Sequence, residues 1–163
     1  MINIRNNPKQ SDLSAVRNIL ESSGYFYDHE ITVALELVQE TLDDKENSTY
    51  RFIFADDDDR TIGFTCYGLI PCTVASYDLY WIAVHEDYRG KGIGRIILDE
   101  TESIISGENG HQLFIETSNR PLYHSTRSFY LKAGFTETVV IKDFYDMNDD
   151  KVIYSKIIRV TVA

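Results

Sequence analysis

Three glycines at alternate positions lie between an apolar run and a helical pattern. The segment reads Arg89-Gly90-Lys91-Gly92-Ile93-Gly94, and Arg95 follows it. Glycine lets a ligand approach the backbone closely, and the first N–H groups of a helix have no acceptor within the helix. The positive end of the helix dipole and the cations of Arg89, Lys91 and Arg95 add to these donors. The segment therefore predicts a site for an anion such as a pyrophosphate.

The spacing of these glycines distinguishes between three phosphate-binding motifs. The nucleotide P-loop pattern G-x-x-x-x-G-K-[ST] does not occur here. The dinucleotide pattern G-x-G-x-x-G fails, because the sixth position counted from Gly90 is Arg95. The pattern that fits is R-x-x-G-x-G, which runs from Arg89 to Gly94.

A second motif lies downstream, as Phe129-Tyr130-Leu131-Lys132-Ala133-Gly134-Phe135. It fits the pattern F/L-Y-x-x-x-G-F. Together, the two motifs and their separation resemble the GNAT N-acetyltransferase superfamily, and the expected order of elements matches that family over nearly the whole chain. The resemblance implies that acetyl-CoA is the co-substrate and that no metal is needed.

In that family the cofactor lies where two central parallel strands splay apart, here 79–84 and 111–117. The resemblance implies that Ile82 and Val84, with Ala83 between them, offer backbone groups to the pantetheine arm. It also implies that the N–H groups of the turn hold the pyrophosphate. The common pattern has Asn and Ala seven and four residues before the tyrosine, whereas this chain has Tyr123 and Thr126. Tyr123 and Thr126 are the two alternatives for a replacement of the asparagine contact. The residues expected at the cofactor are Ile82, Ala83, Val84, Arg89, Gly90, Lys91, Gly92, Ile93, Gly94, Arg95, Tyr123 and Thr126.

The family transfers the acetyl group by direct attack of an amine on the thioester. The resemblance implies that Tyr130 is the general acid for the leaving thiolate, with plain packing as the alternative. The general base stays open between Glu116, Asp78, and water or another residue. A partly desolvated carboxylate has a raised pKa, which suits it to accept a proton. Both carboxylates also have a simpler interpretation, as polar ends of strands.

The acceptor is expected to be a primary amine of a small cationic molecule. Asp78 and Glu116 would attract its ammonium, and the aromatic loop that contains Tyr25 and Phe26 could close over it. Tyr80 is also expected to contact the acceptor. The alternative for these aromatics is burial against the following helix. A protein or peptide amine is the alternative acceptor, and a homodimer is compatible with the family.

Two further function classes are alternatives to an acetyltransferase. A Cys–His enzyme could use Cys66 or Cys72 with His85, His111 or His124, but no signature surrounds either cysteine. The histidines and cysteines also lack zinc-ligand spacing. A CoA-binding module without catalysis would keep the fold, and the intact tyrosine and glycine motif argue against it.

Arg127 could reach a cofactor phosphate or could be an exposed helix cation.

The surrounding pattern predicts the elements that position these residues. Strands are expected at 2–5, 50–55, 61–70, 79–84, 111–117, 135–141 and 151–159, and helices at 8–23, from 28 onward, from 93 to 107, and at 126–133. The fold class is therefore α/β (α+β): a mixed, mostly antiparallel sheet of six to seven strands with helices on both faces and a central splayed parallel pair. Asp56–Asp59 is expected to be a solvated hairpin turn rather than a metal site. Residues 93, 96, 97, 104 and 105 are expected to form the buried face of the third helix.

Composition limits the remaining possibilities. The chain has 163 residues and a formal net charge of −10, which argues against partners such as nucleic acid or an anionic membrane surface. We expect one domain over 1–163. No apolar run is long enough to span a membrane, and the N-terminus does not resemble a signal peptide. With two cysteines, the cytoplasm is the expected location.

Overall fold

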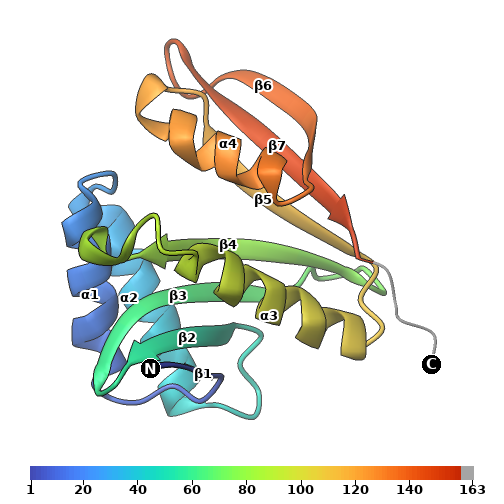
Figure 1. The fold of residues 1–163 in the computed structure, drawn as a ribbon. Coiled ribbons are helices and arrows are strands. Elements are labelled where there is room, and N and C mark those ends of the chain that lie inside the picture. Colours follow the sequence, from blue (N-terminus) through green and yellow to red (C-terminus); the bar gives the residue numbers. More distant parts are fainter. Residues whose placement is uncertain (159–163) are drawn as a thin grey trace. The chain divides into compact units, whose positions relative to one another are not determined.

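The computed structural model describes residues 1–158 (Figure 1). Its helices and strands follow the order expected from the sequence, with two short 3₁₀ helices added. The strands are β1 (Ile2–Arg5), β2 (Arg51–Asp57), β3 (Arg60–Leu69), β4 (Ser76–Val84), β5 (Gln112–Ser118), β6 (Thr136–Asp146) and β7 (Asp149–Ile157). The helices are α1 (Asp12–Ser23), α2 (Asp28–Asp43), η1 (Glu86–Tyr88), α3 (Ile93–Gly107), η2 (Pro121–Tyr123) and α4 (His124–Lys132).

The strands form one seven-stranded sheet in the order β1-β2-β3-β4-β5-β7-β6. β1–β2, β2–β3, β5–β7 and β6–β7 pair antiparallel, and β4–β5 pair parallel. The parallel register joins Ser76–Asp78 to Gln112–Phe114, the first residues of each strand. The predicted fold class, a mostly antiparallel mixed sheet with a central parallel pair, is confirmed.

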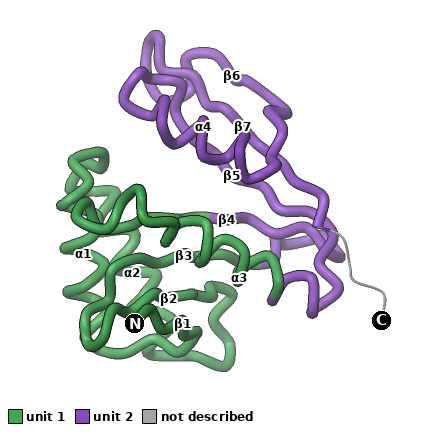
Figure 2. Tube along the Cα trace, viewed as in Figure 1, with its two compact units in different colours: residues 1–68, 80–103 green, residues 69–79, 104–163 purple. Residues whose placement is uncertain are grey.

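The chain forms two compact units (Figure 2). Unit 1 comprises residues 1–68 and 80–103, and unit 2 comprises residues 69–79 and 104–163. β4 contributes its first four residues to unit 2 and the remainder to unit 1.

In unit 1, helices cover both faces of the strands. Side chains alternate between the two faces, so neighbouring residues of β3 contact different helices. Phe64 and Cys66 of β3 pack with buried side chains of α1 and α2 on one face. On the other face, the Thr65 hydroxyl lies 2.8 Å from the hydroxyl of Thr101 in α3. β2 and β3 are accordingly buried along most of their length.

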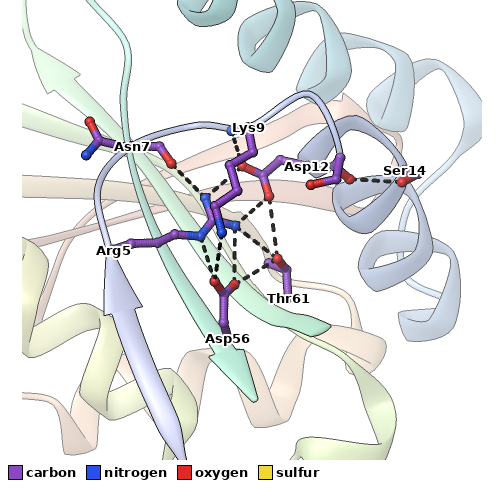
Figure 3. Close-up of polar contacts among 8 residues, drawn as sticks. Arg5, Asn7, Lys9, Asp12, Ser14, Asp56 and Thr61 are labelled. Carbon is purple, nitrogen blue, oxygen red and sulfur yellow. Dashed lines mark hydrogen bonds and ion pairs between the residues drawn. The ribbon is translucent and has the colours of Figure 1, made fainter. Parts of the chain in front are cut away.

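An ion-pair network ties β1 to α1 and β2 in unit 1 (Figure 3). The Arg5 guanidinium donates to both carboxylate oxygens of Asp12, at 2.9 and 2.6 Å, and its Nε donates to Asp56 at 2.7 Å. Thr61 donates to Asp56 at 2.8 Å, and Lys9 lies 3.7 Å from the same carboxylate. Burial opposes the charge of Asp56, but the hydrogen bonds from Arg5 and Thr61 and the two cations outweigh it and lower the pKa of Asp56.

This network corrects the expectation of four solvated aspartates. The hairpin turn is present, with Asp58 at φ 51° between β2 and β3. Asp56, however, is buried, because its carboxylate is the acceptor for Arg5. No group of three or more possible metal ligands occurs within residues 1–158.

In unit 2, α4 packs against β7 through Tyr130. The ring centre of Tyr130 lies 5.7 Å from that of Tyr154 and 6.0 Å from that of Phe135. Leu113 and Ile115 of β5 are buried. β6 forms the edge of the sheet, and its residues are exposed.

Some boundaries and faces differ from those expected. β4 begins at Ser76, three residues early, and Tyr80 within it is 40% exposed. In α3, Ile96 is 43% exposed, while Leu98 and Thr101 are buried. The assignment of Ile96 to the buried face of α3 was therefore wrong. The buried face includes the polar Thr101, which hydrophobic periodicity does not detect. Arg159 of the last predicted strand lies outside the described residues. Within 1–158, none of the helices has the length and apolar character required to cross a membrane.

Candidate active site

The glycine turn of unit 1 has the backbone geometry that an anion site requires. Gly90 and Gly92 adopt φ values of 71° and 81°, which side-chain-bearing residues rarely adopt. A Cβ built on either glycine would meet no atom within 4 Å, so the space beside the turn is open. The N–H of Ile96 donates to the carbonyl of Gly92 at 3.1 Å, as in a helix. The N–H groups of the residues before Ile96 lie ahead of this hydrogen-bond ladder, as in the first turn of any helix. These residues fit a phosphate group.

Gly63 of β3 fixes the start of α3 above the sheet. A Cβ at Gly63 would lie 3.2 Å from the Ala83 carbonyl and 3.4 Å from a methyl group of Ile93. The absence of a side chain here lets the first residue of α3 pack closely on β3 and β4. Sequence reasoning missed this residue, because an isolated strand glycine gives no sign of what approaches it.

His85 holds the segment between β4 and the glycine turn. Its backbone N–H donates to Ile62 at 2.8 Å, and its Nδ1 lies 3.3 Å from the N–H of Asp87. Its Nε2 lies 3.0 Å from a guanidinium nitrogen of Arg60. The ring is buried. His85 and Arg60 therefore shape the turn, although the sequence suggested His85 only as a partner for cysteine.

The three cations of the turn have different surroundings. The Arg89 guanidinium lies 4.9 Å from the ring centre of Tyr25, and the Lys91 ammonium lies 4.8 Å from that of Tyr88. Arg95 instead pairs with Asp99 at 2.7 Å, one helical turn further along α3. That hydrogen bond raises the pKa of Arg95. Arg89 and Lys91 are the exposed cations adjoining Gly90.

The strand residues expected at the cofactor, Ile82, Ala83 and Val84, are half-buried. A central strand covered on both faces would be fully buried, as β2 and β3 are. This end of β4 is therefore less covered than the neighbouring strands β2 and β3.

The aromatic loop between α1 and α2 is anchored within unit 1. The ring centre of Phe26 lies 5.1 Å from that of Trp81, and Phe26 packs against the core. Tyr25 lies on Arg89. Tyr80 contacts Tyr50 edge-on at 5.4 Å. The buried alternative therefore describes Phe26, whereas Tyr25 contacts Arg89 of the glycine turn.

Tyr130 is buried in unit 2 among aromatic rings. Burial raises the pKa of its hydroxyl, and Tyr154 and Tyr123 add to this effect. A phenol in this environment stays protonated at neutral pH, as a proton donor must.

The residues that depart from the family pattern lie in η2 and in the first turn of α4. Tyr123 is buried, with the Arg120 guanidinium 5.4 Å from its ring centre, and Thr126 is half-buried. Arg127 donates to the carbonyls of Ser118 and Arg120, at 2.8 and 2.9 Å. The interpretation of Arg127 as an exposed helix cation was therefore wrong, since its guanidinium closes the loop after β5.

Asp78 and Glu116 share one face of unit 2. Asp78 pairs with Phe114 across the parallel register, and Glu116 is two residues further along β5. Burial raises the pKa of Asp78, and the charge of Glu116 raises it further, while Lys151 opposes this. Glu116 is half-exposed, and its carboxylate forms an ion pair with the ammonium of Lys151 at 2.7 Å. Sequence reasoning did not find Lys151, because β7 meets β5 only in the folded sheet.

The two cysteines have different surroundings. Cys66 is buried in the core of unit 1, and burial raises the pKa of its thiol well above the usual value. Cys72 is an exposed thiol of unit 2. A buried, protonated thiol at Cys66 is a packing residue.

Comparisons with known proteins connect these features. A family model described as the acetyltransferase (GNAT) domain matches residues 48–137. Over 86 residues the chain is 30% identical to an uncharacterised N-acetyltransferase of Chlorobaculum tepidum. That match covers 53% of this chain and 50% of the relative, so the chain spans about half the length of this curated relative.

Solved structures match over nearly the whole chain. A Desulfovibrio desulfuricans protein assigned as an acetyltransferase of the GNAT family is 40% identical, with a TM-score of 0.95, over 98% of this chain and 100% of that one. The ribosomal-protein-S18-alanine N-acetyltransferase of Escherichia coli is 19% identical (TM-score 0.76; 99% and 97% covered). An aminoglycoside 6′-N-acetyltransferase complexed with coenzyme A is 17% identical (TM-score 0.76; 100% and 99% covered).

Proposed function

The chain belongs to the GNAT family of acetyltransferases, and we propose from this that it moves an acetyl group from acetyl-CoA to a primary amine. The observation that carries the proposal is the open glycine turn at the start of α3, where Gly90 and Gly92 have positive φ and Arg89 and Lys91 adjoin them. The N–H groups from Arg89 to Arg95 would bind the pyrophosphate.

The backbone of Ile82, Ala83 and Val84 would pair with the pantetheine arm as an added strand. Their half-buried state supports this role. Tyr123 and Thr126 are proposed to replace the asparagine contact of the family pattern. Arg95 is proposed to act through its backbone N–H, because its side chain pairs with Asp99.

In the proposed reaction the amine nitrogen bonds to the thioester carbonyl carbon and the carbon–sulfur bond breaks. Tyr130 gives its proton to the leaving thiolate, and a base takes the proton released by the amine, through water. We propose Asp78 rather than Glu116 as this base. Burial raises the pKa of Asp78, whereas the Glu116 carboxylate is already neutralised by Lys151.

We propose a small cationic amine as the acceptor. The carboxylate of Asp78 supports this, because an ammonium would partly offset its buried charge. Tyr80, at 40% exposure, offers a ring face to a cation. A peptide amine is the alternative. Of two structures with the same TM-score, one is named as an acetyltransferase of a ribosomal protein and the other as an acetyltransferase of an aminoglycoside.

The proposal extends to the organisation of the protein. One domain over 1–163 is supported by the matched segment 48–137, which contains residues of both units. The cytoplasm remains the proposed location, on the cysteine content. A second copy of the chain is a proposed partner, and light scattering after size exclusion tests it.

The experiment for the activity is release of free CoA thiol, followed with DTNB over polyamines, free amino acids, aminoglycosides and lysine-containing peptides. We expect turnover with at least one small cationic amine, at a higher kcat/KM than with any peptide. Higher kcat/KM for peptides would reverse the acceptor proposal. CoA binding without thiol release for any amine would favour a CoA-binding module instead.

A further inference from the structure

We propose that Tyr25 positions Arg89 for the cofactor phosphates, and therefore acts on the cofactor side of the reaction rather than on the acceptor. This inference rests on the proposed function, because it assigns the cofactor to the turn around Gly90 and Gly92. Both residues lie in unit 1.

The contact is between the guanidinium carbon of Arg89 and the ring centre of Tyr25, at 4.9 Å. Arg89 is exposed and directly precedes Gly90. An arginine stacked on an aromatic ring keeps the donors at the edge of its plane available. The ring can thus hold Arg89 in place while its N–H groups remain free to bind a phosphate.

The position of Tyr25 is fixed by its own neighbours. Gly24 ends α1 at φ 68°, and the N–H of Tyr25 donates to the Ser23 hydroxyl at 3.2 Å. The next residue, Phe26, is anchored on Trp81 of β4 at 5.1 Å. These contacts hold the ring before any ligand binds.

A separate contact joins the end of α1 to the cofactor segment. The N–H of Glu86 in η1 donates to the hydroxyl of Ser22 at 3.1 Å. The α1–α2 loop and the segment that leads into the glycine turn are therefore attached at two places, Ser22–Glu86 and Tyr25–Arg89. This attachment makes Tyr25 part of the framework of the turn.

The expected benefit is preorganisation. An exposed arginine that is already ordered loses less side-chain freedom when it binds phosphate. Removing the ring should weaken CoA binding by about 2- to 5-fold, the range for an exposed cation–π contact. Because phenylalanine retains the ring that contacts Arg89, Tyr25→Phe should keep the effect.

The test measures the CoA dissociation constant by calorimetry for the wild type, Tyr25→Ala, Tyr25→Phe, Arg89→Ala and the Tyr25→Ala/Arg89→Ala pair. Trp81, the only tryptophan of the sequence, gives a second readout by fluorescence. His29→Ala is the matched control, since it removes an exposed ring at the start of α2. Thermal unfolding checks that each variant is folded.

We expect Tyr25→Ala to weaken CoA binding and to raise the KM for acetyl-CoA, with kcat and the KM for the amine unchanged. Tyr25→Phe and His29→Ala should match the wild type, and Tyr25→Ala should have no further effect once Arg89 is alanine. Equal losses with and without Arg89, or a change confined to the amine KM, would overturn the inference. A wild type that binds no CoA would overturn the proposed function itself, whereas unchanged CoA binding by Tyr25→Ala would overturn this inference alone.

Discussion

The ammonium of Lys151 lies 2.7 Å from a carboxylate oxygen of Glu116. The same ammonium lies 3.7 Å from the ring centre of Phe144, and the side chain of Lys151 is only 12% exposed. Glu116 is therefore neutralised by a residue of the neighbouring strand β7. Asp78 lies on the same face, and its pKa is raised by burial first and by the charge of Glu116 second.

These charges predict opposite pH shifts if Asp78 is the base. Glu116→Gln removes a negative neighbour, so the pKa of Asp78 should fall and the acidic limb of log kcat/KM should move to lower pH. Lys151→Met removes a positive neighbour and should move that limb to higher pH. We expect each shift to be about 0.5–1 pH unit. The pH profile of kcat/KM measures both.

Asp78→Asn completes this experiment. It should abolish the acidic limb and lower kcat at neutral pH. It should also stabilise the fold at that pH, because the raised pKa means that the folded state disfavours the ionised carboxylate and that stability falls as the pH rises through it. If Glu116 is the base instead, Glu116→Gln will remove most of the activity rather than shift its profile.

Tyr130→Phe should lower kcat and leave acetyl-CoA affinity nearly unchanged. The variant keeps the ring among Phe129, Phe135 and Tyr154 and removes only the proton donor. Loss of a general acid typically costs about 10²- to 10⁴-fold, so we expect a fall in kcat of at least about tenfold. Steady-state kinetics with calorimetry of CoA binding separate the two effects.

Tyr154→Phe is the control for Tyr130→Phe, because it removes a second buried hydroxyl from the same aromatic cluster. Its kcat should equal that of the wild type. A Tyr130→Phe variant with wild-type kcat would make Tyr130 a packing residue.

Much of the fold could be predicted because its signals are local. The glycine turn and the tyrosine motif are contiguous segments, and the order of strands and helices follows from hydrophobic periodicity. The buried face of α3 shows where this fails. Thr101 is buried through its hydrogen bond to Thr65 in β3, and periodicity in hydrophobicity gives no weight to a threonine.

The candidate site was less predictable because its decisive contacts join distant segments. Lys151 meets Glu116 through the antiparallel pairing of β5 with β7. Tyr25 meets Arg89 across 64 positions of the sequence, and both residue types are common on any surface. Neither pair has a spacing that would identify it.

Arg5→Met should strongly destabilise the protein. The substitution leaves the buried carboxylates of Asp12 and Asp56 without the guanidinium that binds both. Breaking a buried ion pair from one side costs about 3–5 kcal/mol, which lowers Tm by on the order of 10 °C in a chain of this size. Scanning calorimetry at pH 7 measures this loss.

Two comparisons test the origin of that loss. Arg17→Met removes an exposed ion pair with Glu21 and should cost no more than about 0.5 kcal/mol. The pKa of Asp56 is lowered in the folded state, so its contribution is present above its unfolded pKa and is lost as the pH falls through the folded value. The difference between wild type and Arg5→Met should therefore shrink in acid, and a constant difference down to low pH would contradict the ion-pair origin.

Gly92→Ala should remove most of the stabilisation that CoA gives. Gly92 has φ 81°, and a Cβ there would meet no protein atom, so the added methyl group would occupy the open space proposed for the phosphate. A tenfold loss of affinity lowers the stabilisation at saturating ligand by about 1.4 kcal/mol. The measurement is the CoA-induced rise in Tm, compared with each variant's own unliganded Tm, because alanine at this φ also strains the backbone. Gly107→Ala at the end of α3 is the control, since a Cβ there also meets nothing within 4 Å and its φ is not positive. Equal CoA-induced rises in Tm in the two variants would contradict a role of the glycine turn in cofactor binding.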